Sequence, residues 1–95
     1  MRSEKSIQAD IVKHLRASGA WVFKVHGSAL QQAGVPDLVG CLPDGKMFGL
    51  EVKRPGKKLT AIQAHIIEQI KAAGGIAGRV ESVADVEALC VLTTG

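Results

Sequence analysis

The stretch DLVGCLPDGKMFGLEVK, residues 37–53, decides the fold. Two runs rich in apolar and β-forming residues, 37–42 and 46–53, are predicted to be strands. Between them lies Pro43-Asp44-Gly45, in which Pro suits the first central position of a type I turn and Gly accepts the left-handed conformation that follows. The sequence therefore predicts a β-hairpin with a three-residue loop and a bulge at the Gly.

The length of this loop sets which residues of the hairpin face one another. A three-residue loop pairs Leu42 with Lys46, and counting back along both strands then places Asp37 opposite Glu51. Directly opposed residues share one face of the sheet, with Cβ atoms about 4.5–5.5 Å apart, and Lys53 points to the same side as Glu51. A two-residue Asp-Gly turn would shift the register by one and separate the two acids, unless a bulge corrected the offset.

Two carboxylates and one ammonium on one sheet face suit metal-assisted hydrolysis of a phosphodiester. Ionised carboxylates this close repel each other unless a cation lies between them, and carboxylate oxygens are ligands that Mg²⁺ accepts. Lys53 would lie where negative charge builds up during the reaction. The alternative is a solvated sheet face that binds nothing. The basic segment 54–58, which follows directly, favours the first interpretation.

Composition indicates one small globular domain. The chain has 95 residues, of which 46% are hydrophobic, and a net charge of +3 that suits a polyanionic partner without proving one. The three aromatic residues, Trp21, Phe23 and Phe48, are too few to predict a base-stacking sheet. Cys41 and Cys90 are expected to be buried thiols in a reducing compartment. With no signal segment or bilayer-spanning run visible, we expect a cytoplasmic protein without membrane contact.

The remaining sequence predicts three helices and two further strands around the hairpin. Helices are expected over 4–18, from Thr60 to Gly74 and from Ser82 onward, and strands over 20–25 and 76–80. Ser3 is predicted to be an N-cap, and Gln63 completes a capping box with Thr60. The predicted order is α-β-β-β-α-β-α, an α/β fold in a single domain spanning residues 1–95.

This pattern resembles the PD-(D/E)xK nuclease superfamily. Pro36-Asp37 and Glu51-Val52-Lys53 stand in the places of the motif that gives the superfamily its name. The chain is most similar to the virus-type replication-repair nuclease (VRR-NUC) domain, in its small free-standing phage and bacterial form. That closer resemblance rests on Ser3-Glu4 with Gln8, on the run 34–37, and on Thr60 with Gln63. It implies a restriction-endonuclease-like core, with a mixed central sheet flanked by helices.

The resemblance also implies a metal-dependent nuclease. Asp37 and Glu51 would bind Mg²⁺ or Mn²⁺, with the main-chain carbonyl of Val52 as a further ligand. Glu4 would be a ligand directly or through water, although an acid in the first turn of a helix also has a purely structural explanation. Lys53 would orient or deprotonate the attacking water or stabilise the phosphorane, and electrostatic stabilisation is the role we favour.

The resemblance assigns Gln63 a part in positioning the site, which is compatible with capping. The predicted DNA contacts are Arg54, Lys57, Lys58, Lys24 and Ser28. The expected function is structure-selective cleavage of branched DNA such as Holliday junctions, by a homodimer without an organic cofactor. The last helix and the N-terminal helix are possible surfaces for pairing. The alternatives are a nucleic-acid-binding module that has the nuclease fold but no activity, and a purely structural domain.

Overall fold

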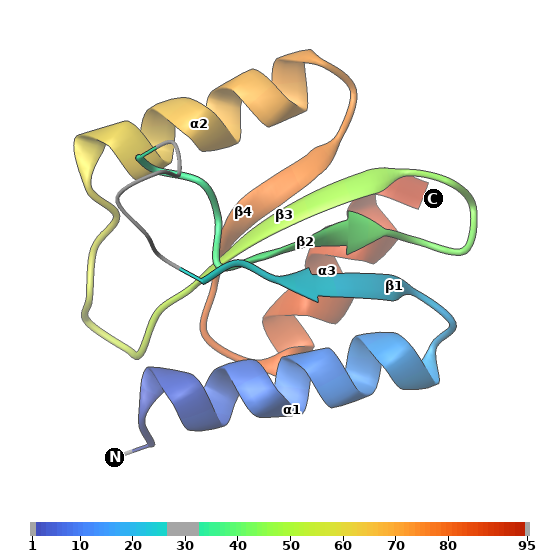
Figure 1. The fold of residues 1–95 in the computed structure, drawn as a ribbon, viewed down its shortest axis with the longest axis horizontal. Helices are drawn as coiled ribbons and strands as arrows, with labels where there is room; N and C mark the ends of the chain where they lie inside the picture. Colours follow the sequence, from blue (N-terminus) through green and yellow to red (C-terminus); the bar gives the residue numbers. More distant parts are fainter. Residues whose placement is uncertain (1, 27–32, 95) are drawn as a thin grey trace.

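A mixed four-stranded sheet organises the molecule, whose computed structural model describes residues 2–26 and 33–94. The elements in chain order are α1 (Glu4–Ala17), β1 (Trp21–Lys24), β2 (Leu38–Cys41), β3 (Met47–Val52), α2 (Ala61–Ala72), β4 (Ile76–Val80) and α3 (Val83–Thr94). The sheet order is β1-β2-β3-β4, with β1, β2 and β3 antiparallel and β4 parallel to β3 (Figure 1). The predicted α/β class and element order are confirmed.

The β2–β3 hairpin has the predicted loop and register. Leu38 pairs with Leu50, as the three-residue connection requires. The amide of Gly45 donates to the carbonyl of Leu42 at 2.8 Å, which closes a type I turn, and the amide of Leu42 donates to the carbonyl of Lys46 at 2.8 Å. Gly45 has φ +92°, the left-handed conformation that Gly adopts at least cost. Both strands are slightly shorter than predicted, and the facing residues are unchanged.

Side-chain caps fix where two helices begin. The hydroxyl of Ser3 accepts a hydrogen bond from the amide of Ser6 at 3.1 Å, so α1 begins where the sequence predicts. Thr60 and Gln63 form a complete capping box at the start of α2. This box holds Gln63 in one orientation beside the sheet.

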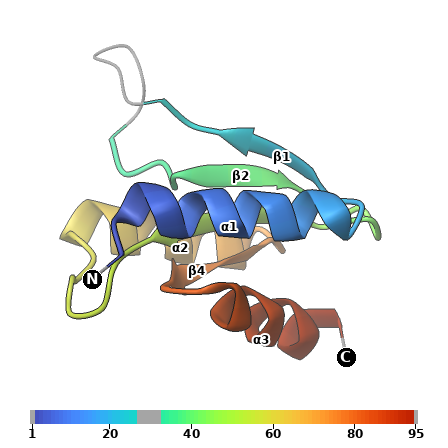
Figure 2. The same ribbon diagram turned by 90° about the horizontal axis from the view of Figure 1, so that it is seen from below.

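The two faces of the sheet are covered unequally. α1 and α3 pack on one face and on each other, and α2 packs on the other face over β3 and β4 (Figures 1 and 2). α2 is the crossover between two parallel strands, so it must lie over that pair, and it leaves β1 and β2 uncovered. The main core lies on the α1–α3 side, where it includes Ile11, Leu38, Phe48, Leu50 and Val86.

The core takes up the apolar stripe of α1 and part of that of α3, the two helices that the sequence offers as possible surfaces for pairing. Ile7, Ile11, Val12 and Leu15 of α1 are buried in the core. Val86 of α3 is also buried there, and Leu89 packs against the same cluster. Amphipathic periodicity identifies a buried stripe but not what covers it. No described helix is both long and apolar enough to cross a bilayer.

Candidate functional site

The predicted acids meet in one row that crosses the sheet on the α2 side. Glu51 of β3 pairs with Arg79 of β4 in parallel register. Asp37 immediately precedes β2, where continuation of the hairpin register places it opposite Glu51. The amide of Val25 donates to the carbonyl of Asp37 at 2.8 Å, so the pairing between the first two strands continues one residue beyond β1 and Val25 lies beside Asp37. The side chains of this row therefore project to one face, as the loop length predicts.

Hydrogen bonds hold both carboxylates in place. Asp37 Oδ2 accepts from the amide of Val52 at 2.9 Å, which ties the acid across to the neighbouring strand. Glu51 Oε1 accepts from Nε2 of Gln63 at 3.1 Å. Only 3% of Glu51 and 8% of Lys53 is exposed. Glu51 and Lys53 are therefore not part of a solvated sheet face, because water does not surround these two ionisable groups.

The second oxygen of Glu51 needs a partner. Glu51 Oε2 is buried and has no hydrogen-bond partner, which is costly for a charged oxygen. Burial raises the pKa of Glu51 to about 8, helped by the nearby carboxyl group of Asp37, while Lys53 lowers it. A proton or a cation would satisfy this oxygen. The donor set therefore fits a hard divalent cation held by two carboxylates and a carbonyl such as that of Val52.

Glu4 lies close to this pair without completing a three-carboxylate site. Its charge is the weakest of the effects that raise the pKa of Glu51. Glu4 Oε2 is buried without a hydrogen-bond partner and lies 3.7 Å from Nζ of Lys57. Within residues 2–26 and 33–94, no three His, Cys, Asp or Glu side chains are arranged to hold a metal ion together. Ligation by Glu4 through water remains the prediction that suits this arrangement.

Gln63 combines the two roles that the sequence suggests. Its side-chain Oε1 accepts a hydrogen bond from the backbone amide of Thr60 at 2.9 Å, and its backbone amide donates to Thr60 Oγ1 at 3.2 Å. Its Nε2 then points to Glu51 Oε1. Capping thus fixes the amide group with its donor toward the acid, so one side chain connects the start of α2 to the carboxylate row.

The predicted DNA-contacting residues are not all on the same side. Arg54, Lys57 and Lys58 are exposed in the loop after β3, next to the carboxylate row, where residues 54–57 line a shallow hollow of about 460 Å³. Lys24 pairs with Leu38 and therefore projects to the α1–α3 face, away from Glu51. Ser28 lies outside the described residues.

Arg79 is a residue that the sequence interpretation missed. It stands beside Glu51 in the β3–β4 register. Its Nε donates to the carbonyl of Lys57 at 2.9 Å, and its Nη2 donates to the carbonyls of Lys57 and Arg54. Nη1 pairs with Glu81. The guanidinium therefore holds the basic loop against the sheet. An Arg inside the apolar run 76–80 was the available signal, but its meaning depends on which strand lies alongside.

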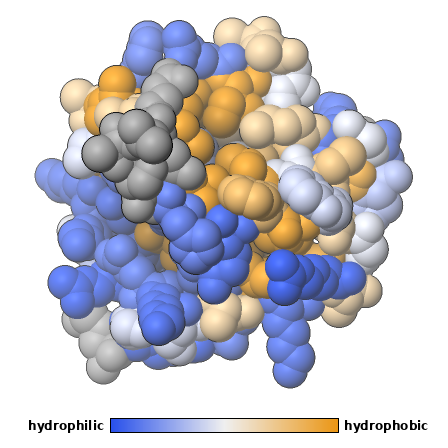
Figure 3. Space-filling model, viewed as in Figure 1, coloured by the Kyte–Doolittle hydropathy of each residue, from blue (hydrophilic) through white to orange (hydrophobic). Residues whose placement is uncertain are grey.

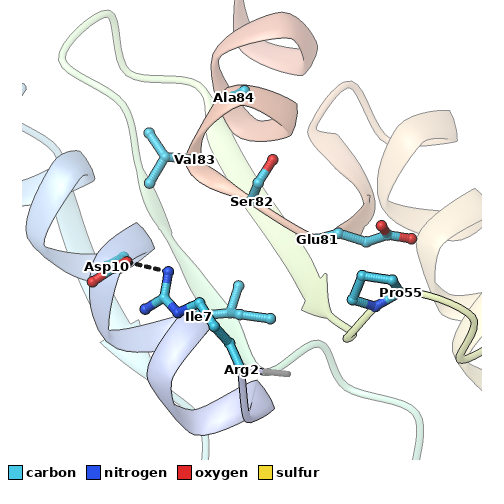
Figure 4. Close-up of a pocket in the computed structure, with 8 residues that line it drawn as sticks. All are labelled: Arg2, Ile7, Asp10, Pro55, Glu81, Ser82, Val83 and Ala84. Carbon is cyan, nitrogen blue, oxygen red and sulfur yellow. Dashed lines mark ion pairs between the residues drawn. The ribbon is translucent and has the colours of Figure 1, made fainter.

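A second hollow lies away from the carboxylates. This cavity of about 520 Å³ lies between α1, Pro55 and the start of α3 (Figure 4). Arg2 forms an ion pair with Asp10 at 2.6 Å on its wall, and Glu81 is paired with Arg79. Because these charged side chains already have partners, the cavity offers a ligand mainly apolar contacts. We assign it no role in the chemistry of the carboxylate row.

Comparison with known proteins supports the resemblance. No family model matches the chain. The "Putative nuclease p44" of Acyrthosiphon pisum secondary endosymbiont phage 1 is 37% identical over 60 residues, which are 63% of this chain. The match spans 62% of that relative, which is less than two thirds of its length.

Two solved structures share the whole architecture. One, described as a VRR_NUC domain, has a TM-score of 0.76 and 27% identity, with 92% of each chain covered. Another, described as a VRR_NUC domain protein, has a TM-score of 0.71 over 99% of this chain and 88% of its own. At 18% identity, the second likeness concerns the fold alone. Together with the phage relative and the carboxylate row, these likenesses support the resemblance of the chain to a small VRR-NUC domain.

Proposed function

We propose that this domain is a divalent-metal-dependent nuclease that hydrolyses DNA phosphodiester bonds. The observation that carries the proposal is the pairing of Asp37 with a buried Glu51 whose second oxygen has no partner. A buried carboxylate oxygen without a partner, next to a second acid, costs stability unless it serves a ligand, and a carboxylate with a raised pKa like that of Glu51 is typical of functional sites. The likeness to a phage relative that is named a nuclease supports the same reading.

The residues divide the chemistry among them. Asp37, Glu51 and the carbonyl of Val52 would hold Mg²⁺ or Mn²⁺, and Glu4 would reach it through water. When bound, such an ion lowers the pKa of water and neutralises charge on the phosphate. Lys53 is almost fully buried next to Glu51, so its ammonium is a fixed positive charge close to where negative charge develops. Gln63 orients the Glu51 carboxylate through its hydrogen bond.

The basic loop after β3 suits the DNA backbone. Arg54, Lys57 and Lys58 are exposed at the end of the carboxylate row, where they would neutralise phosphates without reading sequence. We further propose that the substrate is branched DNA, such as a four-way junction, and that two copies act together. Cleavage of both strands at a junction is served by two sites, whereas residues 2–26 and 33–94 of one chain provide a single carboxylate pair of this kind.

Incubation with a panel of DNAs tests this proposal. Single-stranded, duplex, flap, fork and four-way substrates would be mixed with the protein in Mg²⁺ or Mn²⁺, with Glu51→Gln run in parallel. We expect cleavage that needs the metal, is fastest on the four-way substrate and is lost in the variant. Retention of DNA without cleavage across all metals would favour a binding module. Equal cleavage of every substrate would contradict the structural preference but leave the nuclease intact.

A further inference from the structure

The basic loop after β3 contains a tight turn, Arg54-Pro55-Gly56-Lys57. The amide of Lys57 donates to the carbonyl of Arg54 at 3.1 Å, and Gly56 has φ +86°. Pro followed by a Gly with positive φ is the sequence that favours a type II turn. The chain therefore folds back on itself shortly after β3 ends, and the position of Lys57 is set by the turn.

Arg79 fixes the main chain of this turn against the sheet. Its guanidinium donates to the carbonyls of Lys57 and Arg54, with Nε 2.9 Å from the Lys57 oxygen. Glu81 pairs with the same guanidinium and helps to hold it in place. Because the planar fork of Arg79 holds the main chain, the half-exposed side chain of Lys57 is the part that can change partners.

The ammonium of Lys57 reaches the first turn of α1. Its Nζ lies 3.7 Å from Oε2 of Glu4, and the two side chains are 51% and 34% exposed. This distance is longer than a hydrogen bond, so Oε2 is buried without a hydrogen-bond partner. Glu4 is also close enough to Glu51 for its charge to raise the pKa of that acid. One carboxylate therefore separates Lys57 from the carboxylate row.

This ion pair is one that a cation can displace. A pair that is half exposed and lacks a hydrogen bond contributes little stability. Once Glu4 reaches a divalent ion through water, as proposed above, its negative charge is shared with that ion and Lys57 loses its counter-ion. Figure 3 shows hydrophilic surface gathered at the lower left, where Figure 1 places the start of α1 and the loop after β3. A DNA phosphate that met this surface would be the next anion available to Lys57.

We propose that Lys57 exchanges partners, pairing with Glu4 in the metal-free protein and with a DNA phosphate once a cation takes over Glu4. The inference rests on the proposed function, and it gives Lys57 a role that Arg54 and Lys58 do not share. Metal and DNA then bind cooperatively, and each makes the binding of the other tighter, because a coupling between two sites is reciprocal.

Calorimetric titration of the metal-free protein with Mn²⁺, in the absence of DNA, tests the first half of the exchange. Lys57→Gln should bind Mn²⁺ roughly two- to fivefold more tightly than the wild type, because no ammonium competes with the ion for Glu4. Lys58→Gln removes the same charge from the next, exposed residue and should leave Mn²⁺ affinity unchanged. An affinity of Lys57→Gln that is no tighter than wild type, or an equal gain in both variants, would overturn the inference.

DNA affinity in EDTA tests the second half. A double-mutant cycle of Glu4→Gln and Lys57→Gln would be followed by the fluorescence anisotropy of a labelled four-way DNA. Lys57→Gln should weaken binding roughly two- to fivefold more in the Glu4→Gln background, where the ammonium is free, than in the wild type. Equal losses in the two backgrounds would overturn the inference. Loss of the general charge of Glu4 cancels in this comparison.

The two proposals fail in different ways. A wild type that binds no Mn²⁺ would contradict the proposed metal site, and the exchange with it. A wild type that binds Mn²⁺, together with a cycle that shows no coupling between Glu4 and Lys57, would contradict the exchange alone. A purely structural clip between the loop and α1 would lower the melting temperature of Lys57→Gln without tightening Mn²⁺ binding.

Discussion

At the scale of single residues, the protonation of Glu51 is the property that most affects behaviour. Its pKa is raised to about 8 by burial and by the nearby carboxyl group of Asp37. The folded protein therefore holds this proton where the unfolded chain has released it. The resulting stabilisation is complete below about pH 4.5 and is lost as the pH rises through about 8.

Glu51→Gln should therefore become more stable than the wild type as the pH rises. The amide keeps the shape of the protonated acid and has no proton to lose. Without divalent ions, the melting temperature of the variant minus that of the wild type should grow by several degrees from about pH 5 to about pH 9. Thermal melts over this range would check it, with Glu68→Gln as an exposed control. A difference that does not change with pH would contradict the raised pKa.

Gln63 offers a way to separate capping from its contact with Glu51. Gln63→Glu keeps a residue that suits the capping box but replaces the donor to Glu51 with another carboxylate. It should reduce turnover or metal affinity roughly 10–100-fold. Thr60→Ala removes the capping hydroxyl and leaves the Gln63 donor in place, so it should cost about 1 kcal/mol in stability with most activity retained. If both variants lose activity equally, the contact with Glu51 has no separate role.

At the scale of elements, the hairpin loop controls whether the acids meet. Deletion of Asp44 would leave a two-residue turn, shift the register by one and turn Asp37 away from Glu51. We expect this protein to fold less stably and to lose its thermal response to Mn²⁺. Gly45→Ala keeps the loop length and should cost about 1–2 kcal/mol, because Gly45 has φ +92°, but should still respond to Mn²⁺. A metal response that survives the deletion would show that register does not build the site.

Arg79 should act on DNA binding through the loop that it holds. Arg79→Lys conserves the charge but loses the forked hydrogen bonds to the carbonyls of Lys57 and Arg54. Released from the sheet, the loop should lose phosphate contacts. The slope of log affinity against log salt concentration should then become less steep by roughly 1–2. Lys71→Arg, on the exposed end of α2, is the control and should leave the slope unchanged. A purely structural role would lower stability without changing the slope.

At the scale of the whole molecule, the sequence predicts the chain path better than the exposed surfaces. Turn chemistry at Pro43-Asp44-Gly45 and the caps at Ser3 and Thr60 are local signals, so the hairpin register and helix starts follow from them. The meeting of Asp37 with Glu51 follows from the same register. Burial of Glu51 depends on α2 and β4, which are distant in sequence, and no local pattern reports it.

The surfaces escape prediction for the same reason. Arg79 is placed by the β3–β4 pairing, and exposure of Trp21 and Phe23 depends on α2 covering only part of the sheet. A count of three aromatic residues disfavours a stacking platform but does not reveal that two of them lie side by side on an open face. Lys24 was predicted to lie at the site because it is close to the motif in sequence. Strand alternation places its side chain on the other face of the sheet.

The most direct test of the central claim is calorimetric titration of the metal-free protein with Mn²⁺ near pH 7, in two buffers of different ionisation enthalpy. If Asp37 and Glu51 share one ion, binding must expel the proton that Glu51 holds below about pH 8. We predict saturable binding that releases close to one proton, and loss of that binding in both Asp37→Asn and Glu51→Gln. Binding without proton release, or binding that persists in Asp37→Asn, would contradict the claim that these two carboxylates form a common cation site.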